Sequence, residues 1–161
     1  METPVATTLT IIVCGSRDMM YHKDPFYREQ IFSALDMYHK ICPIQFLAEG
    51  GQTGIDTAAR EWAQKNGVPG KSFFADWTQY GRSAGPIRNK KMLTEIQPNL
   101  VVAFPGGIGT ASMKALARSI KCPVVEINLE NDRSVQVVNI PENTFNLADY
   151  EIVEEREEKT A

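Results

Sequence analysis

The chain has 161 residues, of which 43% are hydrophobic and 23% are charged, and this composition is typical of one soluble globular domain. It argues against a disordered, collagen-like or coiled-coil chain, and the length is too short for two ordinary domains. Five Glu, with Arg156 and Lys159, lie in residues 151–161, which leaves 15 acidic and 15 basic side chains in residues 1–150. Because a nucleic-acid-binding domain normally has a basic surface, this neutral body disfavours nucleic acid as the main partner.

The cysteines indicate a reducing compartment. Cys14, Cys42 and Cys122 are odd in number, widely spaced and flanked by apolar residues, which predicts reduced thiols rather than a disulfide framework. The N-terminus has no basic segment before an apolar run, and no stretch approaches the length of a membrane span. We therefore expect a cytoplasmic protein without a membrane partner. With only His22 and His39 and no CxxC pair, we expect no metal site, and nothing indicates a cofactor.

The first half of the chain alternates strands and helices. Residues 8–13 are β-branched and apolar enough for a strand that is buried on both faces. Asp24 and Pro25 provide an N-cap and a first-turn proline, and apolar residues then recur at helical spacing until about Lys40. Residues 44–48 form the second predicted strand.

A glycine-rich turn, residues 49–54, leads from this strand into the next predicted helix. Thr53 and Asp56 have the spacing of a capping box at the start of that helix. Trp62, further along the same helix, is expected in the core.

The second half continues the alternation. Residues 71–74 predict a third strand, followed by a long polar loop, residues 75–85. Pro86 is placed as the first residue of a helix that extends through Ile96. A loop of this length is often functional.

The last elements complete the predicted sheet. Residues 100–104 and 124–127 predict the fourth and fifth strands, separated by an alanine-rich helix at 111–120, and residues 135–140 predict a sixth strand at an edge. The charged end after about Glu154 is expected to be frayed. The pattern predicts an α/β, Rossmann-like, doubly wound, mostly parallel sheet of five to six strands. We expect a single domain over residues 1–161, with its core at about 8–140 and an acidic tail at about 151–161.

Glycines and small hydroxyl residues follow three of the predicted strands. They lie at 15–16, 50–54 and 106–110. Ligands of open parallel sheets bind beyond the carboxyl ends of the strands, so we expect these three exits to converge on one crevice. Glycines allow close approach of the backbone, and free amides at a helix N-terminus favour an anion, most plausibly phosphate. Neither the Walker A motif nor the GxGxxG dinucleotide motif is present.

A cluster of cations follows the long loop. Arg82, Arg88, Lys90 and Lys91 occur within ten residues with no acid among them. Arg88 and Asn89 fall in the first predicted helical turn, where a cation gains nothing from the helix dipole, so we expect a phosphate or ribose contact there. A solvated helix face accounts for the two lysines.

Two aromatic residues in the same loop, Trp77 and Tyr80, could stack on a base or ribose.

These motifs together resemble the SLOG superfamily, and most closely its YspA-like branch. The resemblance rests on GSR, AEGGQTGIDTAAREWA, ADW, YGRSAGPIRNKKM and FPGGIGTASM, and it extends over about residues 10–127. It implies a Rossmann-type fold that binds nucleotides or nucleotide-derived molecules, and a homodimer or larger homo-oligomer. The alanine-rich predicted helix offers small faces for such packing. Lonely Guy phosphoribohydrolases and the DNA-binding DprA proteins belong to the same superfamily.

The resemblance also bears on catalysis. It implies that the PGGxGT loop, residues 105–110, grips phosphate, and that Arg88 matches an arginine of the Lonely Guy enzymes. Those enzymes place a catalytic glutamate where this chain has Met113, and methionine can neither stabilise an oxocarbenium ion nor take a proton. Whether the chain is an enzyme is therefore open. An acid from elsewhere would be Glu49, Asp56 or Asp18, and we prefer Glu49 as the catalytic residue because a strand end can hold and bury it.

Three hypotheses for the function follow. The chain binds a nucleotide or nucleotide-derived ligand, with N-glycosidic hydrolysis as the chemistry if there is any. Alternatively, it is a noncatalytic sensor or sequestering protein for a signalling nucleotide, and a single-stranded DNA binder is the least favoured. The expected ligand-binding residues are Gly15, Ser16, Arg17, Gly50, Gly51, Thr53, Asp56, Trp77, Arg82, Arg88, Asn89, Pro105, Gly106, Gly107, Gly109 and Thr110.

Overall fold

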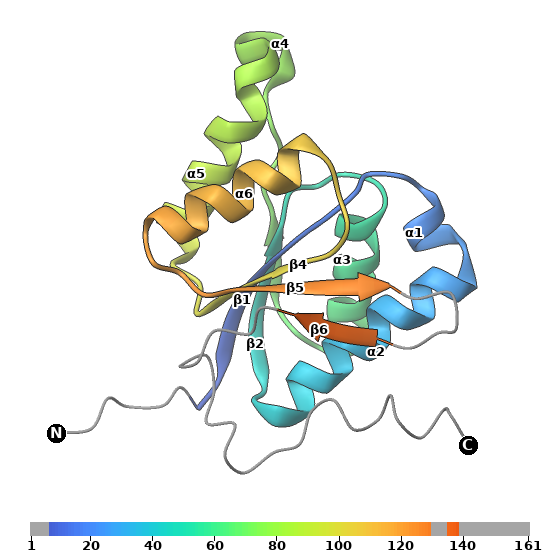
Figure 1. Ribbon diagram of the computed structural model, residues 1–161. Coiled ribbons are helices and arrows are strands. Elements are labelled where there is room, and N and C mark those ends of the chain that lie inside the picture. The colour runs from blue at the N-terminus through green and yellow to red at the C-terminus, as the bar shows by residue number, and fades with distance from the viewer. Residues whose placement is uncertain (1–6, 130–134, 139–161) are drawn as a thin grey trace, which may run out of the picture.

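The structure is a computed structural model that describes residues 7–129 and 135–138. Its centre is a six-stranded sheet with the strand order β3-β2-β1-β4-β5-β6 (Figure 1). Strands β1 to β5 are parallel, and β6 pairs antiparallel with β5 at the edge. The sheet confirms the predicted α/β, mostly parallel fold. The strands are β1 (Leu9–Cys14), β2 (Ile44–Glu49), β3 (Gly70–Ser72), β4 (Leu100–Ala103), β5 (Val124–Leu129) and β6 (Val135–Val138).

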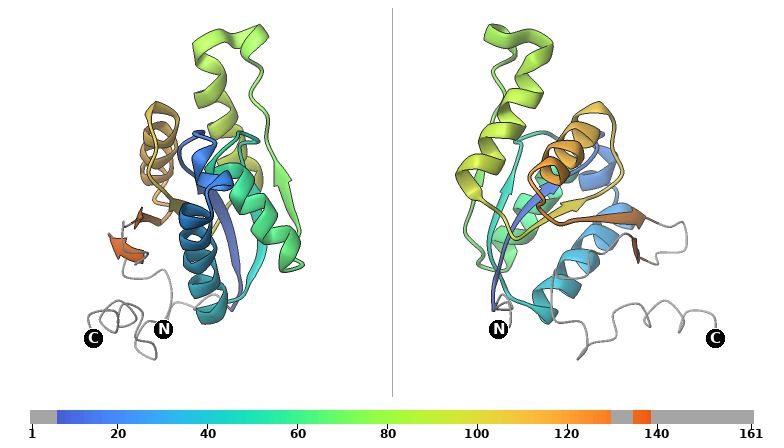
Figure 2. Two further views of the ribbon diagram at one scale, coloured as in Figure 1. Left: turned by 90° about the vertical axis from the view of Figure 1, so that its right-hand side faces the viewer. Right: turned by 60° about the vertical axis from the view of Figure 1, so that its left-hand side comes forward.

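Helices cover both faces of the sheet (Figure 2). The α-helices are α1 (Met20–Lys23), α2 (Pro25–Ile41), α3 (Ile55–Lys65), α4 (Trp77–Tyr80), α5 (Ala84–Ile96) and α6 (Ile108–Ser119), and a short 3-10 helix, η1, spans Gly81–Ser83. Alternate side chains of β1 separate two apolar clusters. Leu9, Ile11 and Val13 pack with residues of α2 and α3, whereas Ile12 packs with residues of α5 and α6. Strand β1 is therefore buried on both faces, as its β-branched run predicts.

The start of α2 follows the sequence prediction. Asp24 caps the helix by accepting a hydrogen bond from the Phe26 amide at 3.0 Å, and Pro25 occupies the first turn. The short helix α1, directly before it, was not predicted. Trp62 lies in the core, as expected, and its Nε1 donates to Asp36 Oδ1 at 2.8 Å.

The predicted capping box at the start of α3 is wrong. Gly54 is the N-cap, with φ +78°, and no side chain caps the helix. Thr53 Oγ1 instead donates to the Arg17 carbonyl, and Asp56 accepts from the amides of Gly50 and Gln52. The reason is tertiary: Gly54 lies so close to the carbonyls of Ser16 and Asp18 that a side chain there would collide with them, so the exit of β1 replaces the local cap.

Other boundaries differ by a few residues. Strand β3 ends at Ser72, and α4 and η1 occupy the predicted loop, because the Asp76 side chain caps α4 by accepting from the Gln79 amide at 3.0 Å. Helix α5 begins at Ala84, two residues before Pro86. Helix α6 begins three residues earlier than predicted, inside the glycine loop. The edge strand β6 is present, whereas residues 139–140, the frayed end and the acidic tail lie outside the described residues.

No disulfide joins the three cysteines, all of which are described. Among the described residues, no helix combines the length and apolar character needed to cross a membrane.

Candidate ligand-binding site

The exits of β1, β2 and β4 meet at the carboxyl-terminal edge of the sheet. The Ser16 amide donates to the Pro105 carbonyl at 2.7 Å, which joins the exits of β1 and β4. The Ile55 amide donates to the Ser16 carbonyl at 2.9 Å, which joins the exits of β1 and β2. Parallel strands end at one edge, so loops far apart in sequence become neighbours there. The expected convergence of the three exits is confirmed.

The glycine loop, residues 105–110, combines a packed and an open part. A side chain at Gly106 would collide with Thr110 and approach the backbone of Gly15, so only glycine fits there. Gly107 and Gly109, in contrast, have open space where a Cβ would be. Gly107 is the N-cap of α6 and contributes no side-chain cap, so the first amides of α6 lack a capping side chain. This geometry suits an anion held by backbone amides.

Glu49, the preferred catalytic residue, is held by three partners. Its side chain is 2% exposed, and its Oε1 accepts from the Gly51 amide at 2.6 Å. Its Oε2 accepts from the Ser72 hydroxyl and lies 3.7 Å from Arg60 Nη1. Oε2 therefore connects the end of β2 to β3 and α3, and Oε1 holds the turn that follows β2. Catalysis by Glu49 would require these contacts to rearrange.

Asp56 is the second buried carboxyl group near the strand exits. It is 6% exposed, and its Oδ2 accepts from the amides of Gly50 at 3.1 Å and Gln52 at 3.2 Å. Burial, reinforced by the negative charge of Glu49, raises the pKa of Asp56 to about 7, although the two amides and Arg88 act in the opposite direction. Asp56 therefore titrates near neutral pH.

Arg88 is turned toward the protein. Its Nη1 donates to the carbonyls of Gly50 at 2.6 Å and Phe73 at 3.1 Å, and its Nε donates to Asn89 Oδ1 at 2.9 Å. Burial lowers the pKa of Arg88, while Asp56 and Glu49 raise it. Within the described residues Nη2 makes no hydrogen bond, so this is the part of the guanidinium that could reach a ligand.

Asn89 joins the two halves of the site. Its Nδ2 donates to the Gly109 carbonyl at 3.2 Å and lies 3.5 Å from the Ser112 hydroxyl. A continuous path of hydrogen bonds thus runs from Gly50 through Arg88 and Asn89 to the glycine loop. Arg88 and Asn89 brace the exits of β2 and β4 against each other, a role that their sequence positions did not suggest.

Trp77 and Arg82 lie on an arm formed by α4, η1 and the start of α5. The arm stands out from the body of the molecule (Figure 1). Trp77 is 46% exposed, and its ring lies over Gly85, where an added Cβ would be 3.4 Å away. Arg17 is exposed at the exit of β1. Among the expected residues, these three are exposed, as are Thr53, Gly106, Gly107 and Gly109.

Two further residues border the site. His22 Nδ1 accepts from the Gly54 amide at 2.9 Å, which fixes the end of the β2 exit, and no spacing in the sequence indicates this long-range contact. Cys14 ends β1, and burial raises the pKa of its thiol to about 12, so it is not a thiolate nucleophile.

Met113 is buried in the core. It is 1% exposed and packs in the apolar cluster between α5, α6 and the sheet, with Ile12, Met92 and Val101 among its members. The position that is a catalytic glutamate in the Lonely Guy enzymes is therefore a core position in this chain.

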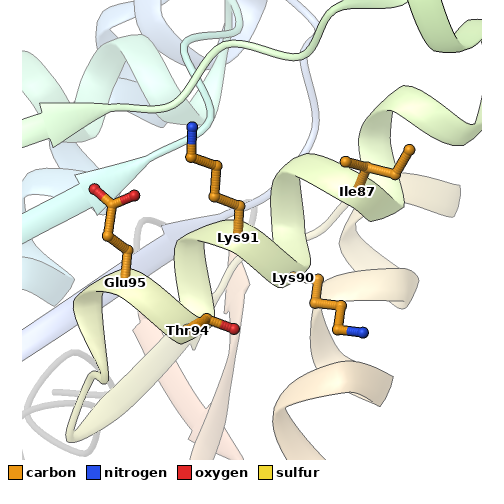
Figure 3. A pocket seen from close by; sticks show the side chains of 5 residues that line it. All are labelled: Ile87, Lys90, Lys91, Thr94 and Glu95. Carbon is orange, nitrogen blue, oxygen red and sulfur yellow. The ribbon is translucent and has the colours of Figure 1, made fainter.

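A separate groove lies on the outer side of α5 (Figure 3). Ile87, Lys90, Lys91, Thr94 and Glu95 line it, all from one helix, and none belongs to the strand exits. In the part of the chain that the structure describes, no group of three His, Cys, Asp or Glu side chains is arranged to hold a metal ion.

The sheet and its convergent glycine-rich exits define a Rossmann-like α/β domain with a loop site at the carboxyl-terminal edge. Residues 9–80 match the model of the YspA, cpYpsA-related SLOG family, and this match confirms the resemblance to the YspA-like branch. The X-ray structure of TM1055, Northeast Structural Genomics Consortium target VT76, is similar in fold. It is 18% identical over 71% of each chain, with a TM-score of 0.55. No curated protein matches the chain.

Proposed function

We propose that this protein binds a nucleotide or nucleotide-derived ligand at the carboxyl-terminal edge of the sheet. The observation that carries the proposal is the open backbone at Gly107 and Gly109, where the uncapped start of α6 meets the exits of β1 and β2. The match of residues 9–80 to a SLOG family supports the same class of ligand. We expect the binding to occur in the cytoplasm.

Calorimetry with AMP and ADP-ribose tests the proposal. Wild type should bind at least one of them, and Gly107→Val should abolish that binding because it fills the space in front of the amides. Ser119→Val adds the same side chain to an exposed position at the far end of α6 and should leave affinity unchanged. Equal affinity in Gly107→Val and wild type would remove the glycine loop from the site.

Within this proposal, a noncatalytic sensor or sequestering protein is favoured by Met113. The position of the Lonely Guy glutamate is here filled by an apolar side chain in the core. N-glycosidic hydrolysis is the alternative, supported by the two buried carboxyl groups of Glu49 and Asp56 at the end of β2 and the start of α3. Chromatographic detection of free adenine after incubation with AMP decides between them. Turnover that survives in both Glu49→Gln and Asp56→Asn would exclude both acids.

Self-association is part of the proposal, as a homodimer or larger assembly. Ala111 and Ala115 of α6 are exposed, whereas Ala117 is buried against the sheet and is not available to a second copy. Light scattering at micromolar concentration should show more than one chain per particle, and a monomer would contradict this. A shift of labelled single-stranded DNA that weakens with salt would revive the nucleic-acid alternative.

A further inference from the structure

Asp56 and Glu49 are two buried carboxyl groups, at the start of α3 and the end of β2, that interact electrostatically. Glu49 ends β2 and Asp56 lies in the first turn of α3, and both are almost completely enclosed. The Gly50 backbone lies between them and the arginine: a Cβ there would be 3.0 Å from Asp56 Oδ2 and 2.6 Å from Arg88 Nη1. Two carboxyl groups in one enclosed place resist carrying full charge at the same time.

The groups around Asp56 do not fully balance the pair. Arg88 of α5 faces it, but its Nη1 and Nε hydrogens go to two carbonyls and to Asn89. Arg60 of α3 lies 3.7 Å from Glu49 Oε2, and Cys14 of β1 is a thiol. His22 of α1 is engaged with the Gly54 amide. Asp56 Oδ2 has two amide donors, whereas its Oδ1 accepts no hydrogen bond within the described residues.

We propose that an anionic ligand binds at the glycine loop together with a proton that Asp56 takes up. The inference rests on the proposed function. A ligand phosphate adds negative charge at an edge of the sheet where the carboxyl pair is already enclosed, and a neutral Asp56 removes part of the repulsion. The contacts between the exits of β1, β2 and β4 place the pair within the same loop cluster as the phosphate site.

The coupling operates at physiological pH. Burial and Glu49 raise the pKa of Asp56 to about 7, so the carboxyl group is partly charged before the ligand arrives. A nearby anion raises this pKa further, and by thermodynamic linkage the protonated protein then binds the anion more tightly. If the ligand raises the pKa by about one, affinity falls about tenfold as the pH rises through this range.

ADP-ribose is the best probe, because its pyrophosphate diester has no group that titrates between about pH 6 and about pH 8.5. Calorimetry in two buffers of different ionisation enthalpy near pH 7.5 should show uptake of about half a proton per ligand bound by wild type. Asp56→Asn should bind without proton uptake, and with the tighter, low-pH affinity over the whole range. Glu49→Gln should move the pH dependence to lower pH, since Glu49 raises the pKa of Asp56.

The outcomes separate this inference from the proposed function. His22→Gln preserves a hydrogen-bond acceptor near Gly54 and should preserve the proton uptake. Loss of proton uptake in this variant alone would assign the proton to His22 and overturn the inference. ADP-ribose binding with equal affinity at every pH would overturn the inference and leave the proposed function intact. A weaker Asp56→Asn at every pH, with the slope retained, would make Asp56 merely structural. If neither ADP-ribose nor AMP binds at any pH, both proposals fail.

Discussion

Replacing Arg88 by alanine should destabilise the protein as well as weaken ligand binding. The substitution removes the donors that Gly50, Phe73 and Asn89 now accept from, and it removes the positive charge that faces Asp56. A hydrogen bond from a charged group is worth about 1.5–3 kcal/mol, and Arg88 makes three such bonds. Arg88 is only partly buried, and these terms are not additive, so the free energy of unfolding should fall by about 3 kcal/mol.

Urea denaturation at pH 7 measures this loss. With an m value of about 2 kcal/mol/M, the midpoint of Arg88→Ala should fall by about 1.5 M. Lys91→Ala is the matched control, because Lys91 is exposed on the same helix, and its stability should stay within about 0.5 kcal/mol of wild type. Arg88→Lys retains the charge but loses the fork of donors, so its stability should be intermediate.

Calorimetry on the same variants distinguishes the structural role of Arg88 from a direct contact between Arg88 and the ligand. Arg88→Ala should bind AMP or ADP-ribose more weakly by about 1.5–3 kcal/mol, whereas Lys91→Ala should bind like wild type. An Arg88→Ala protein with the urea midpoint of Lys91→Ala and no ligand affinity would refute the reasoning. Arg88 would then act on the ligand alone, and the hydrogen bonds to Gly50 and Phe73 would contribute no stability.

Three other substitutions test the site. Gly107→Val should leave the urea midpoint close to that of wild type, because Gly107 has open space around it. Calorimetry on the same variant should show no binding of AMP or ADP-ribose. If the variant is unfolded instead, the loop is packed. Asp56→Asn should flatten the pH dependence of the free energy of unfolding. The pKa of Asp56 rises from 3.8 to about 7 on folding, which stabilises wild type by about 4 kcal/mol below pH 3.8. This stabilisation is lost as the pH rises to about 7. Parallel stability curves of the two proteins between about pH 5 and about pH 8 would contradict this. Met113→Glu places a carboxyl group in an apolar cluster, so it should lower the free energy of unfolding by about 3–5 kcal/mol and create no AMP hydrolysis. The control Met113→Leu should lower it by less than about 1.5 kcal/mol. A stable Met113→Glu protein that hydrolyses AMP would show that this side chain reaches the ligand.

The sequence by itself was sufficient for the order of the elements and for the edge of the sheet where the loops meet. Apolar β-branched runs such as residues 8–13, and local signals such as Asp24 before Pro25, depend on neighbours within a few positions, so they can be read along the chain. The convergence of glycines follows from the same information, because the exits of parallel strands all lie at one edge.

The roles of individual polar side chains were decided by the tertiary structure. Asp56 has the spacing of a capping-box residue, yet it accepts from the β2 exit because Gly54 packs against the exit of β1. Arg88 has the position of a phosphate ligand, yet its Nη1 donates to the carbonyls of Gly50 and Phe73. Met113 has the motif position of the Lonely Guy glutamate, yet it is buried in an apolar cluster. A hydrogen-bond partner, an enclosed charge and a raised pKa depend on atoms that are distant in sequence, and these atoms become neighbours only when the sheet and its helices have packed.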